Sequence, residues 1–505
     1  MQSLVPWNKG SLHKSRPENY MTNFCSRGLD AERCYEALRA RDCRFDGRFY
    51  TAVVSTGIFC RPTCPARTPK FSNCKFYRSA AAAHAAGFRP CLRCRPEVAP
   101  GLAGWRGTAN TVRRALDLIS EGGLSAGNVD ALAARVGVGS RHLRRLFEEH
   151  VGASPLDVAQ AQRLLFAKKL LSETHLKVSD VAFAAGFGSV RRFNAAIRSA
   201  YGRTPRELRS APAARDHRIE LKLPYAPPYD WAAMLHYLQA RAIEGVEQVD
   251  GAIYRRSVDV GIVEVRPGSD GYLLATIELT DVAGVASVVA RLRRLLDLDC
   301  DVRIVGDHLS RDPRLASSVA ARPGLRVPGA WDGFETAVRA ILGQQITVSA
   351  ARQLAGKMAE RFGAPLPRSF SRLRRRFPRP EALAGADIES LAMPRARARA
   401  VSALAAEVVA NPDLLSPVGD LEDNLRRLER LPGIGKWTAQ YIAMRVFREP
   451  DAFPASDVGL LRSMETTRSG VTVRPSPEEL SEMAEAWRPW RAYAAQHLWM
   501  KGVDA

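Results

Sequence analysis

The feature that most constrains this chain is the spacing of four of its cysteines. Cys60 and Cys64 form the clip CRPTC, and Cys91 and Cys94 form the clip CLRC after a gap of 26 residues. Two such clips can place four sulfurs around one ion, which is a ligand set that tetrahedral Zn²⁺ prefers. The spacing therefore predicts a zinc site. Taken alone, it fits a structural zinc knuckle better than a reactive centre.

The other cysteines show no comparable pairing: Cys25, Cys34, Cys43, Cys74 and Cys300. No secretory signal precedes them, so we expect a reducing cytoplasm and no framework of disulfides. Only Cys300 lies beyond Cys94, so a four-cysteine iron–sulfur cluster in the C-terminal half is excluded. No stretch approaches the roughly 20 apolar residues that a membrane span requires, so no membrane partner is expected.

The length and charge of the chain point to several domains and to a polyanionic partner. At about 100–200 residues for each domain, 505 residues predict three or four of them. Lys and Arg exceed Asp and Glu by 74 − 53 = 21, and arginines cluster in RHLRR and SRLRRR. Such a charge favours DNA binding, with an ordinary basic surface as the alternative. Residues 1–24 lack periodicity and predict a flexible arm.

Residues 25–97 predict a small domain around the four cysteines. The run RFDGRFYTAVVSTGIFC alternates and carries a glycine turn, which predicts a hairpin that leads to Cys60. SAAAAHAAGF predicts a short helix. The Pro- and Gly-rich residues 95–107 form a plausible linker to the next domain.

Residues 108–210 contain two copies of one helical plan. The copies are NVDALAARVGVGSRHLRRLFEEHVGASP and KVSDVAFAAGFGSVRRFNAAIRSAYGRTP. In each copy an apolar helix meets a glycine-containing turn, and the next helix exposes arginines, as in a helix-turn-helix. A packed helical bundle is the alternative for one copy, but two in tandem favour DNA binding. The expected contacts are Arg141, Arg144, Arg145, Arg191 and Arg192.

The remaining residues predict one mixed and one helical domain. Residues 217–330 contain the paired alternating segments GIVEVRPG and YLLATIEL and the helical run VASVVARLRRLLDL, which predict an α+β subdomain. Helical patterns dominate residues 331–505. The fold class is therefore multidomain and mainly α with α+β parts.

A glycine turn in the helical domain predicts a second DNA contact. LPGIGKWTAQYIAMRVF places Gly433, Gly435 and Lys436 at the start of an amphipathic helix, after the helical stretch DNLRRLERL. Free backbone amides at a helix N-terminus bind phosphate, and glycines allow close approach. This pattern is a helix-hairpin-helix, with an ordinary helix hairpin as the alternative.

Asp457 stands just before the next predicted helix, in FPASDVGLLR. A helix N-cap is the usual role of Asp in such a position, and a functional carboxylate is compatible with it. Three aromatic residues accompany Asp457: Trp437 and Tyr441 shortly before it in the sequence, and Trp499 on the last predicted helix. Such rings usually belong to a core, but electron-rich rings beside one carboxylate also form a receptor for a flat cation.

Three family resemblances together cover nearly the whole chain. The segments TGIFCRPTCPAR and AAGFRPCLRCRPE resemble the N-terminal zinc domain of the Ada methylation-damage sensors. Residues 108–210 resemble the AraC-type helix-turn-helix region that follows it. Residues 217–505 resemble the AlkA alkylbase DNA glycosylases through PPYDWAAML, RPGLRVPGAWDGFETAVRAILGQQITV, LPGIGKWTAQY, Asp457 and WRPWRAYAAQHLW, which implies a TBP-like α+β subdomain and an all-α glycosylase domain of the helix-hairpin-helix superfamily.

The Ada resemblance implies that Cys60 accepts a methyl group from a DNA methylphosphotriester while it ligates zinc. Methylation removes one negative charge, which we expect to strengthen binding to a promoter. The transferase domain that Ada carries for O-alkylated guanine, with its PCHR motif, has no counterpart here.

The AlkA resemblance implies a base-flipping enzyme that hydrolyses the N-glycosidic bond of bases such as 3-methyladenine. Asp457 matches the catalytic carboxylate, and Trp437, Tyr441 and Trp499 match the base pocket. Gln345 stands where that family inserts a leucine wedge into the duplex. Bifunctional relatives carry a lysine where this chain has Trp437, so a monofunctional enzyme without Schiff-base chemistry is expected. A monovalent cation at the hairpin is a further expectation.

The predicted protein is therefore a DNA alkylation repair enzyme joined to a transcriptional regulator. Its expected partners are double-stranded DNA, both damaged and promoter, and RNA polymerase, in a bacterial cytoplasm at the nucleoid. The alternative is a methylation-activated transcription factor whose glycosylase half only binds DNA.

Overall fold

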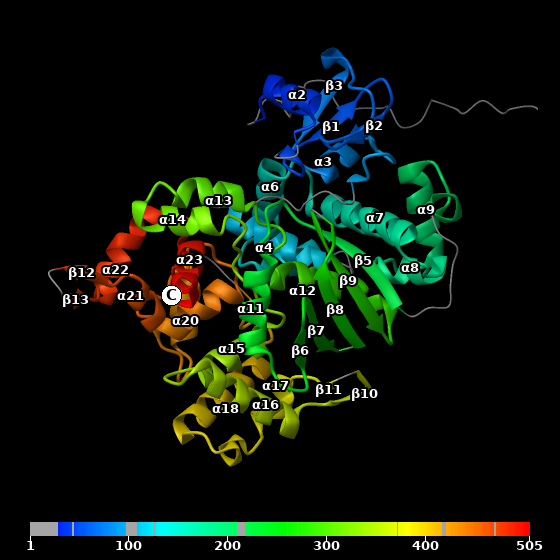
Figure 1. Cartoon of the computed structure of the whole chain (residues 1–505). Coiled ribbons are helices and arrows are strands. Elements are labelled where there is room, and N and C mark those ends of the chain that lie inside the picture. The colour runs from blue at the N-terminus through cyan, green and yellow to red at the C-terminus, as the bar shows by residue number, and fades with distance from the viewer. Residues whose placement is uncertain are drawn as a thin grey trace, which may run out of the picture.

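The computed structural model describes residues 29–42, 45–96, 109–124, 128–209, 218–259, 261–269, 271–370, 372–416, 421–468 and 471–504. The predicted arm at residues 1–24, Cys25 and Cys43 lie outside them. Figure 1 shows the order of the elements in space. No helix in the described part of the chain is long and apolar enough to cross a membrane.

The cysteine-rich domain is a small sheet with helices beside it. The strands follow the order β3-β1-β2-β4, and β2 pairs with β4 in parallel. The predicted hairpin before Cys60 is formed by β1 and β2, which are antiparallel. The bounds are α2 (Ala31–Ala40), β1 (Tyr50–Val53), β2 (Ile58–Cys60), η2 (Phe71–Asn73), β3 (Cys74–Tyr77), α3 (Ala80–Ala85) and β4 (Arg89–Pro90).

Both predicted helix-turn-helix copies are helical, and one long helix connects them. In the first copy α5 precedes α6, in the second α8 precedes α9, and α7 lies between the copies. Ser154 caps α7 through a reciprocal capping box with Asp157, which fixes where this helix begins. The bounds are α4 (Ala109–Ser120), α5 (Val129–Arg135), α6 (Ser140–His150), α7 (Pro155–Glu173), α8 (Val178–Ala184), α9 (Val190–Tyr201) and α10 (Pro205–Leu208).

The α+β part contains a five-stranded antiparallel sheet in the order β5-β9-β8-β7-β6. Alternation in β5 is strict, because Ile219, Leu221 and Leu223 are buried and their neighbours are exposed. The bounds are β5 (Arg218–Pro224), α11 (Trp231–Arg241), β6 (Glu247–Asp250), β7 (Ile253–Val258), β8 (Gly261–Pro267), β9 (Tyr272–Leu279), η4 (Val282–Gly284), α12 (Val285–Leu295), α13 (Val302–Leu309) and α14 (Pro313–Ala321).

The last part is helical, as predicted, with two short hairpins that the sequence pattern did not reveal, β10–β11 and β12–β13. The bounds are α15 (Gly333–Leu342), α16 (Val348–Phe362), β10 (Pro365–Phe370), β11 (Leu373–Arg375), α17 (Pro380–Ala384), η5 (Ile388–Leu391), α18 (Arg395–Ala410), α19 (Leu421–Glu429), α20 (Lys436–Arg445), α21 (Val458–Ser463), β12 (Thr466–Arg468), β13 (Val471–Val473), α22 (Pro477–Met483), η6 (Ala484–Trp487) and α23 (Arg491–Asp504).

Hydrophobic cores extend across the predicted domain boundaries. One core joins the first sheet to α4–α7, for example through Tyr50 and Phe147. Another joins the second helix-turn-helix copy to the five-stranded sheet, and a third joins α13 and α14 to the helical part. The parts on either side of the predicted boundaries therefore pack against one another. The boundaries themselves, at residues 97, 108, 210, 217 and 330, stay predictions.

A buried ion pair fixes α4, the helix before the first helix-turn-helix copy, to the helical part. Arg114 on α4 donates a hydrogen bond of 2.6 Å to the Glu449 carboxylate just beyond α20, and the two side chains are only 3% and 2% exposed. Arg113 approaches the same carboxylate at 3.7 Å. At the surface Arg135 pairs with Asp413 across the same interface.

We expect Glu449→Gln to lower the free energy of unfolding by about 3–5 kcal/mol, because it leaves the Arg114 guanidinium buried without its countercharge. Asp413→Asn is the matched control, since it removes an exposed pair from the same interface and should cost less than about 1 kcal/mol. Thermal unfolding of both full-length variants checks this. Equal melting temperatures would contradict the expected role of Glu449.

Candidate functional site

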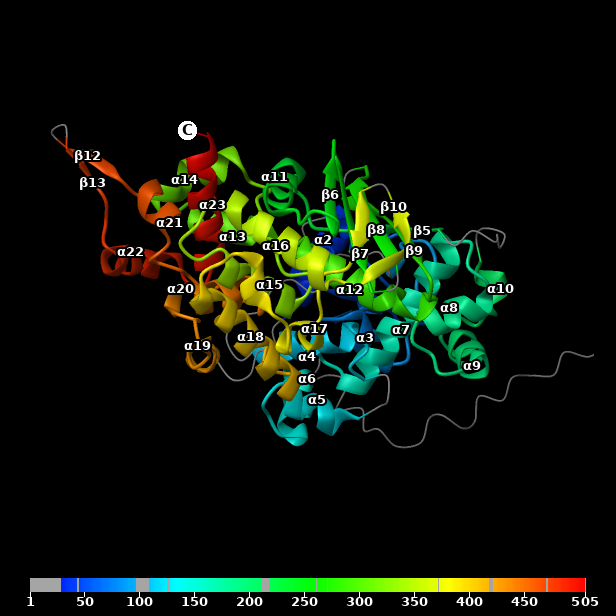
Figure 2. The same cartoon turned by 90° about the horizontal axis from the view of Figure 1, so that it is seen from below.

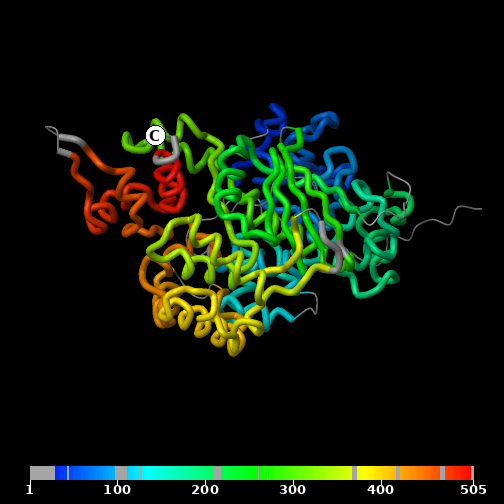
Figure 3. Tube along the Cα trace, turned by 60° about the horizontal axis from the view of Figure 1, so that its bottom comes forward, coloured from blue at the N-terminus to red at the C-terminus, as the bar shows by residue number. Residues whose placement is uncertain are grey.

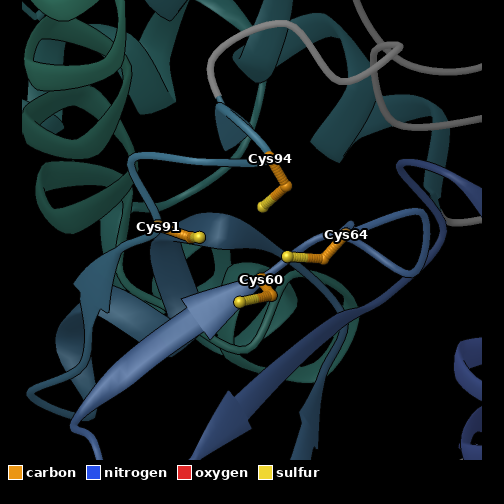
Figure 4. Close-up of side chains that lie close together, drawn as sticks. All are labelled: Cys60, Cys64, Cys91 and Cys94. Carbon is orange, nitrogen blue, oxygen red and sulfur yellow. The ribbon is translucent and has the colours of Figure 1, made fainter. Parts of the chain in front are cut away.

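The four predicted cysteines meet at the end of the first sheet. Parallel pairing of β2 with β4 sets Phe59 opposite Pro90, so Cys60 and Cys91 emerge side by side. The loops that follow bring in Cys64 and Cys94, and all four sulfurs lie within 4.8 Å of one another. Figure 4 shows the four side chains pointing toward a common centre. The predicted set of thiols is thus assembled by the fold.

This set of donors fits Zn²⁺. Four sulfurs at such distances match a closed tetrahedral site. Four thiolates packed this closely would repel one another unless a cation lay between them, so the donor set suits a divalent metal ion. Arg61 stabilises the loop: its backbone N–H donates to Cys94 Sγ at 3.3 Å, and its guanidinium pairs with Asp46.

Cys60 differs from the other three thiols in exposure. Cys64, Cys91 and Cys94 are 5%, 7% and 7% exposed, whereas Cys60 is only partly buried. A nucleophile must be reachable by its substrate, and a purely structural ligand need not be. Cys60 is thus the least buried of the four residues, although its sulfur is buried in the cluster with the other three.

Asp457 lies in the wall of a cavity of about 1320 Å³ between the sheet part and the helical part. Its Oδ1 accepts hydrogen bonds from the backbone N–H groups of Gly459 and Leu460 at 2.9 and 3.1 Å, so it is the N-cap of α21. Trp499 Nε1 donates to the same oxygen at 2.8 Å, and Trp437 Nε1 donates to Oδ2 at 2.8 Å. Four N–H groups thus hold one carboxylate at the cavity wall.

Aromatic rings line the same cavity. Trp437 and Tyr441 stand one turn apart on α20 and stack with their centroids 5.2 Å apart and their planes at 14°. Trp499 enters from α23. The three predicted pocket residues are therefore brought together around Asp457, as a receptor for a flat base requires.

The glycine turn between α19 and α20 has the predicted tight geometry. Gly433 has φ +77°, and a Cβ there would lie 2.4 Å from the Ala400 Cβ, so only glycine fits. Gly435 is the exposed N-cap of α20, and Lys436 follows it. Gln344 holds the turn by donating to the Gly433 carbonyl at 2.8 Å.

Gln345 lines the same cavity as Asp457. It is exposed, with φ +56°, in the turn that follows α15. A side chain in the left-handed region costs roughly 1–3 kcal/mol, and such strain concentrates at functional sites.

Comparisons with known proteins assign all these parts. Family models match residues 33–97 (metal binding domain of Ada), 132–211 (helix-turn-helix domain), 220–332 (AlkA N-terminal domain) and 338–490 (HhH-GPD superfamily base excision DNA repair protein). The probable bifunctional transcriptional activator/DNA repair enzyme AlkA of Mycobacterium tuberculosis is 41% identical over 481 residues, which cover 93% of this chain and 96% of that relative. The chain belongs to this bifunctional AlkA family.

Two relatives from Escherichia coli correspond to its halves. DNA-3-methyladenine glycosylase 2 is 37% identical over 55% of this chain and 95% of its own length. The bifunctional transcriptional activator/DNA repair enzyme Ada is 33% identical over 36% of this chain and 49% of its own length. The matched regions join a metal-binding Ada domain to a helix-hairpin-helix glycosylase domain.

In this AlkA-family chain the predicted reader arginines lie on the helices expected of them. Arg141, Arg144 and Arg145 are exposed on α6, and Arg191 and Arg192 are exposed at the start of α9. Leu143 and Phe147 face the opposite side of α6 and are buried. The amphipathic spacing thus separates a packing face from a basic face.

Two residues of the cavity were missed by the sequence reasoning. Tyr237 on α11 places its hydroxyl 3.1 Å from that of Tyr441, although 204 positions separate the two. Arg445, at the end of α20, is 1% exposed, and its guanidinium lies 4.8 Å from the Tyr237 ring centroid and 5.3 Å from that of Trp499. The sequence gives little indication of a cavity role for either residue. Tyr237 lies in a helix after PPYDW, and Arg445 has the pattern of an ordinary basic residue in a helix.

Proposed function

We propose that the chain excises alkylated bases such as 3-methyladenine from double-stranded DNA by hydrolysis of the N-glycosidic bond. The observation that carries this is the Asp457 carboxylate held at the wall of an aromatic cavity by two indole N–H groups. A flipped base would stack among Trp437, Tyr441 and Trp499. A cationic alkylated base gains most from such rings and is already a good leaving group.

The four hydrogen bonds to Asp457 favour one catalytic role over another. Oδ1 already accepts three N–H donors and Oδ2 accepts one, so few lone pairs of the carboxylate are left to take a proton from water, and activation of water is the lesser role. We infer that the carboxylate stabilises the positive charge that develops on the sugar as the bond to the base breaks. The electron pair leaves with the base, and water then adds to the sugar carbon and releases one proton to the solvent. Because Trp437 stands where a lyase has lysine, a monofunctional reaction stays our prediction.

The glycosylase part would bind DNA through its glycine turn. The amides before α20, with Lys436, would bind a backbone phosphate, while Gln345 would fill the gap left by the flipped base and hydrogen-bond the orphan partner. A monovalent cation at this turn stays a prediction.

We further propose that Cys60 takes a methyl group from a DNA methylphosphotriester. Cys60, Cys64, Cys91 and Cys94 would hold the zinc ion, which would keep their sulfurs ionised, with a net charge of about −2 that leaves them nucleophilic. The S–C bond forms at Cys60 as the methyl C–O bond breaks, and the electron pair leaves on the phosphodiester oxygen. The match of residues 33–97 to the metal binding domain of Ada supports this choice.

Loss of one negative charge on Cys60 would strengthen DNA binding by the helix-turn-helix arginines. The methylated protein would then bind its promoter more tightly and signal the DNA damage to RNA polymerase. The alternative, a transcription factor whose glycosylase half only binds DNA, does not explain the preserved carboxylate and its aromatic cavity. The bacterial cytoplasm and nucleoid, and the domain boundaries given above, stay predictions.

One experiment tests both chemistries. Purified full-length protein is incubated with DNA treated with a methylating agent; released bases are then measured, and protein methylation is mapped by mass spectrometry. We expect released 3-methyladenine in excess over protein and no more than one methyl group per chain, on Cys60. Absence of released base would remove the glycosylase proposal, and absence of a methylated cysteine would remove the acceptor proposal.

A further inference from the structure

Helix α9 and the glycine turn before α20, two of the proposed DNA-binding sites, lie at opposite ends of the described part of the molecule. Figures 1, 2 and 3 agree that α8–α10 and α20–α23 lie on opposite sides of the five-stranded sheet. The first end carries the exposed Arg191 and Arg192 at the start of α9. The second carries Lys436 and Asp457 at the starts of α20 and α21.

The arginine end is fixed to the sheet by a shared core. Leu171 on α7 and Val181 on α8 belong to the same buried cluster as Leu221 on β5 and Val285 on α12, and all four are fully buried. Lys169 adds a polar contact, because its ammonium donates to the Lys222 carbonyl and pairs with Glu173. A core of this kind does not let α9 swing away from the sheet.

Helix α4, which precedes the first helix-turn-helix copy, is fixed by ion pairs to the loop beyond the far end of α20. Helix α20 begins at Lys436 beside the glycine turn and ends at Arg445, and Glu449 just beyond it holds Arg114 of α4. Arg448 in the same loop pairs with Asp117 of α4 at 3.6 Å. The regulator half therefore contacts the end of α20 that lies away from the turn.

These placements prevent one short straight duplex from reaching both DNA-binding regions. The persistence length of DNA is about 150 base pairs, so a short duplex does not wrap around a protein of this size by itself. We propose that the chain binds two DNA segments at once, a lesion duplex at the glycine turn and cavity, and a second duplex on the arginine face of α9. This proposal rests on the proposed function, because it requires DNA binding by each half.

A capture experiment with the full-length protein tests it. A duplex with a non-hydrolysable abasic-site analogue is immobilised, loaded with protein and washed, and a fluorescent unmodified duplex of random sequence is added at low salt, where non-specific binding is strong. We expect capture of the fluorescent duplex, and a loss of at least tenfold in R191E/R192E. R218E/R266E is the matched control, since it reverses two exposed arginines on the sheet, and should capture normally.

Separate assays keep the proposal distinct from the functions on which it rests. The control R218E/R266E should excise methylated bases at the parental rate, and the captured complex should have the mass of one chain with two duplexes. The proposal is overturned if parental protein binds each duplex alone but never both, if R191E/R192E captures normally, or if the complex contains two chains. Failure of excision, or of binding to either duplex alone, would instead remove the proposed function.

Discussion

Asp457→Asn is expected to lower the rate of base excision by at least about 100-fold while DNA binding persists. An electrostatic group that acts on developing charge contributes about 3–4 kcal/mol, and each 1.4 kcal/mol is a factor of ten. Asn keeps the shape and the N-cap acceptor for Gly459 and Leu460, but it loses the charge and the acceptor for the Trp437 indole. Single-turnover release of 3-methyladenine, beside binding to an abasic-site duplex, measures both properties.

Asp332→Asn is the matched control for this experiment. Asp332 is the N-cap of α15 in the same helical part, where it accepts from the Glu335 N–H at 3.0 Å. The same chemical change there should leave excision unaltered. If Asp457→Asn retained excision within tenfold of the parental rate, Asp457 would be a structural cap and the assignment of the catalytic carboxylate would be wrong.

Cys60→Ser is expected to abolish methyl uptake, from as much as one methyl group per chain to none. A serine hydroxyl stays protonated at neutral pH and is a far weaker nucleophile than a thiolate. Base excision should persist, because Asp457 and its cavity belong to a different part of the chain. Quantitative mass spectrometry after incubation with methylated DNA gives the first result, and base release from the same sample gives the second.

Cys74→Ser provides the matched control for Cys60. Cys74 lies in the same small sheet, outside the cluster, and burial raises the pKa of its thiol to about 11. A thiol with this pKa is protonated at neutral pH, so Cys74 should accept no methyl group and its loss should change nothing. Methylation of Cys64, Cys91 or Cys94 in the parental protein would contradict the choice of Cys60.

Local sequence patterns were sufficient to predict those features that residues close together in the chain form. The clips CRPTC and CLRC each bring two sulfurs together within a few residues, so their spacing already predicted the cluster. The glycine turn before α20 was predictable for the same reason, because Gly433 has a backbone conformation and a close contact that require glycine. Both helix-turn-helix copies follow from helical periodicity.

Contacts between distant segments were beyond such patterns. The hydroxyl pair of Tyr237 and Tyr441 joins helices 204 positions apart, and Arg114 meets Glu449 across 335 positions. The sequence around either residue of a pair does not predict which distant residue it contacts. The two hairpins in the helical part, β10–β11 and β12–β13, were also missed, because tertiary packing overrides weak local preference in short strands.

The sequence alone determined which chemical groups this protein has: four thiols in two clips, a carboxylate before a helix, aromatic rings near it, and arginines on two repeated helices. Only the tertiary structure decided how they act. It aims both the Trp437 and Trp499 indoles at Asp457, gathers the four thiols into one cluster, and sets α9 and the glycine turn on opposite sides of the five-stranded sheet. The physical reason is that hydrogen bonds and buried charges depend on distances of a few ångströms, which are set by packing between segments far apart in the chain.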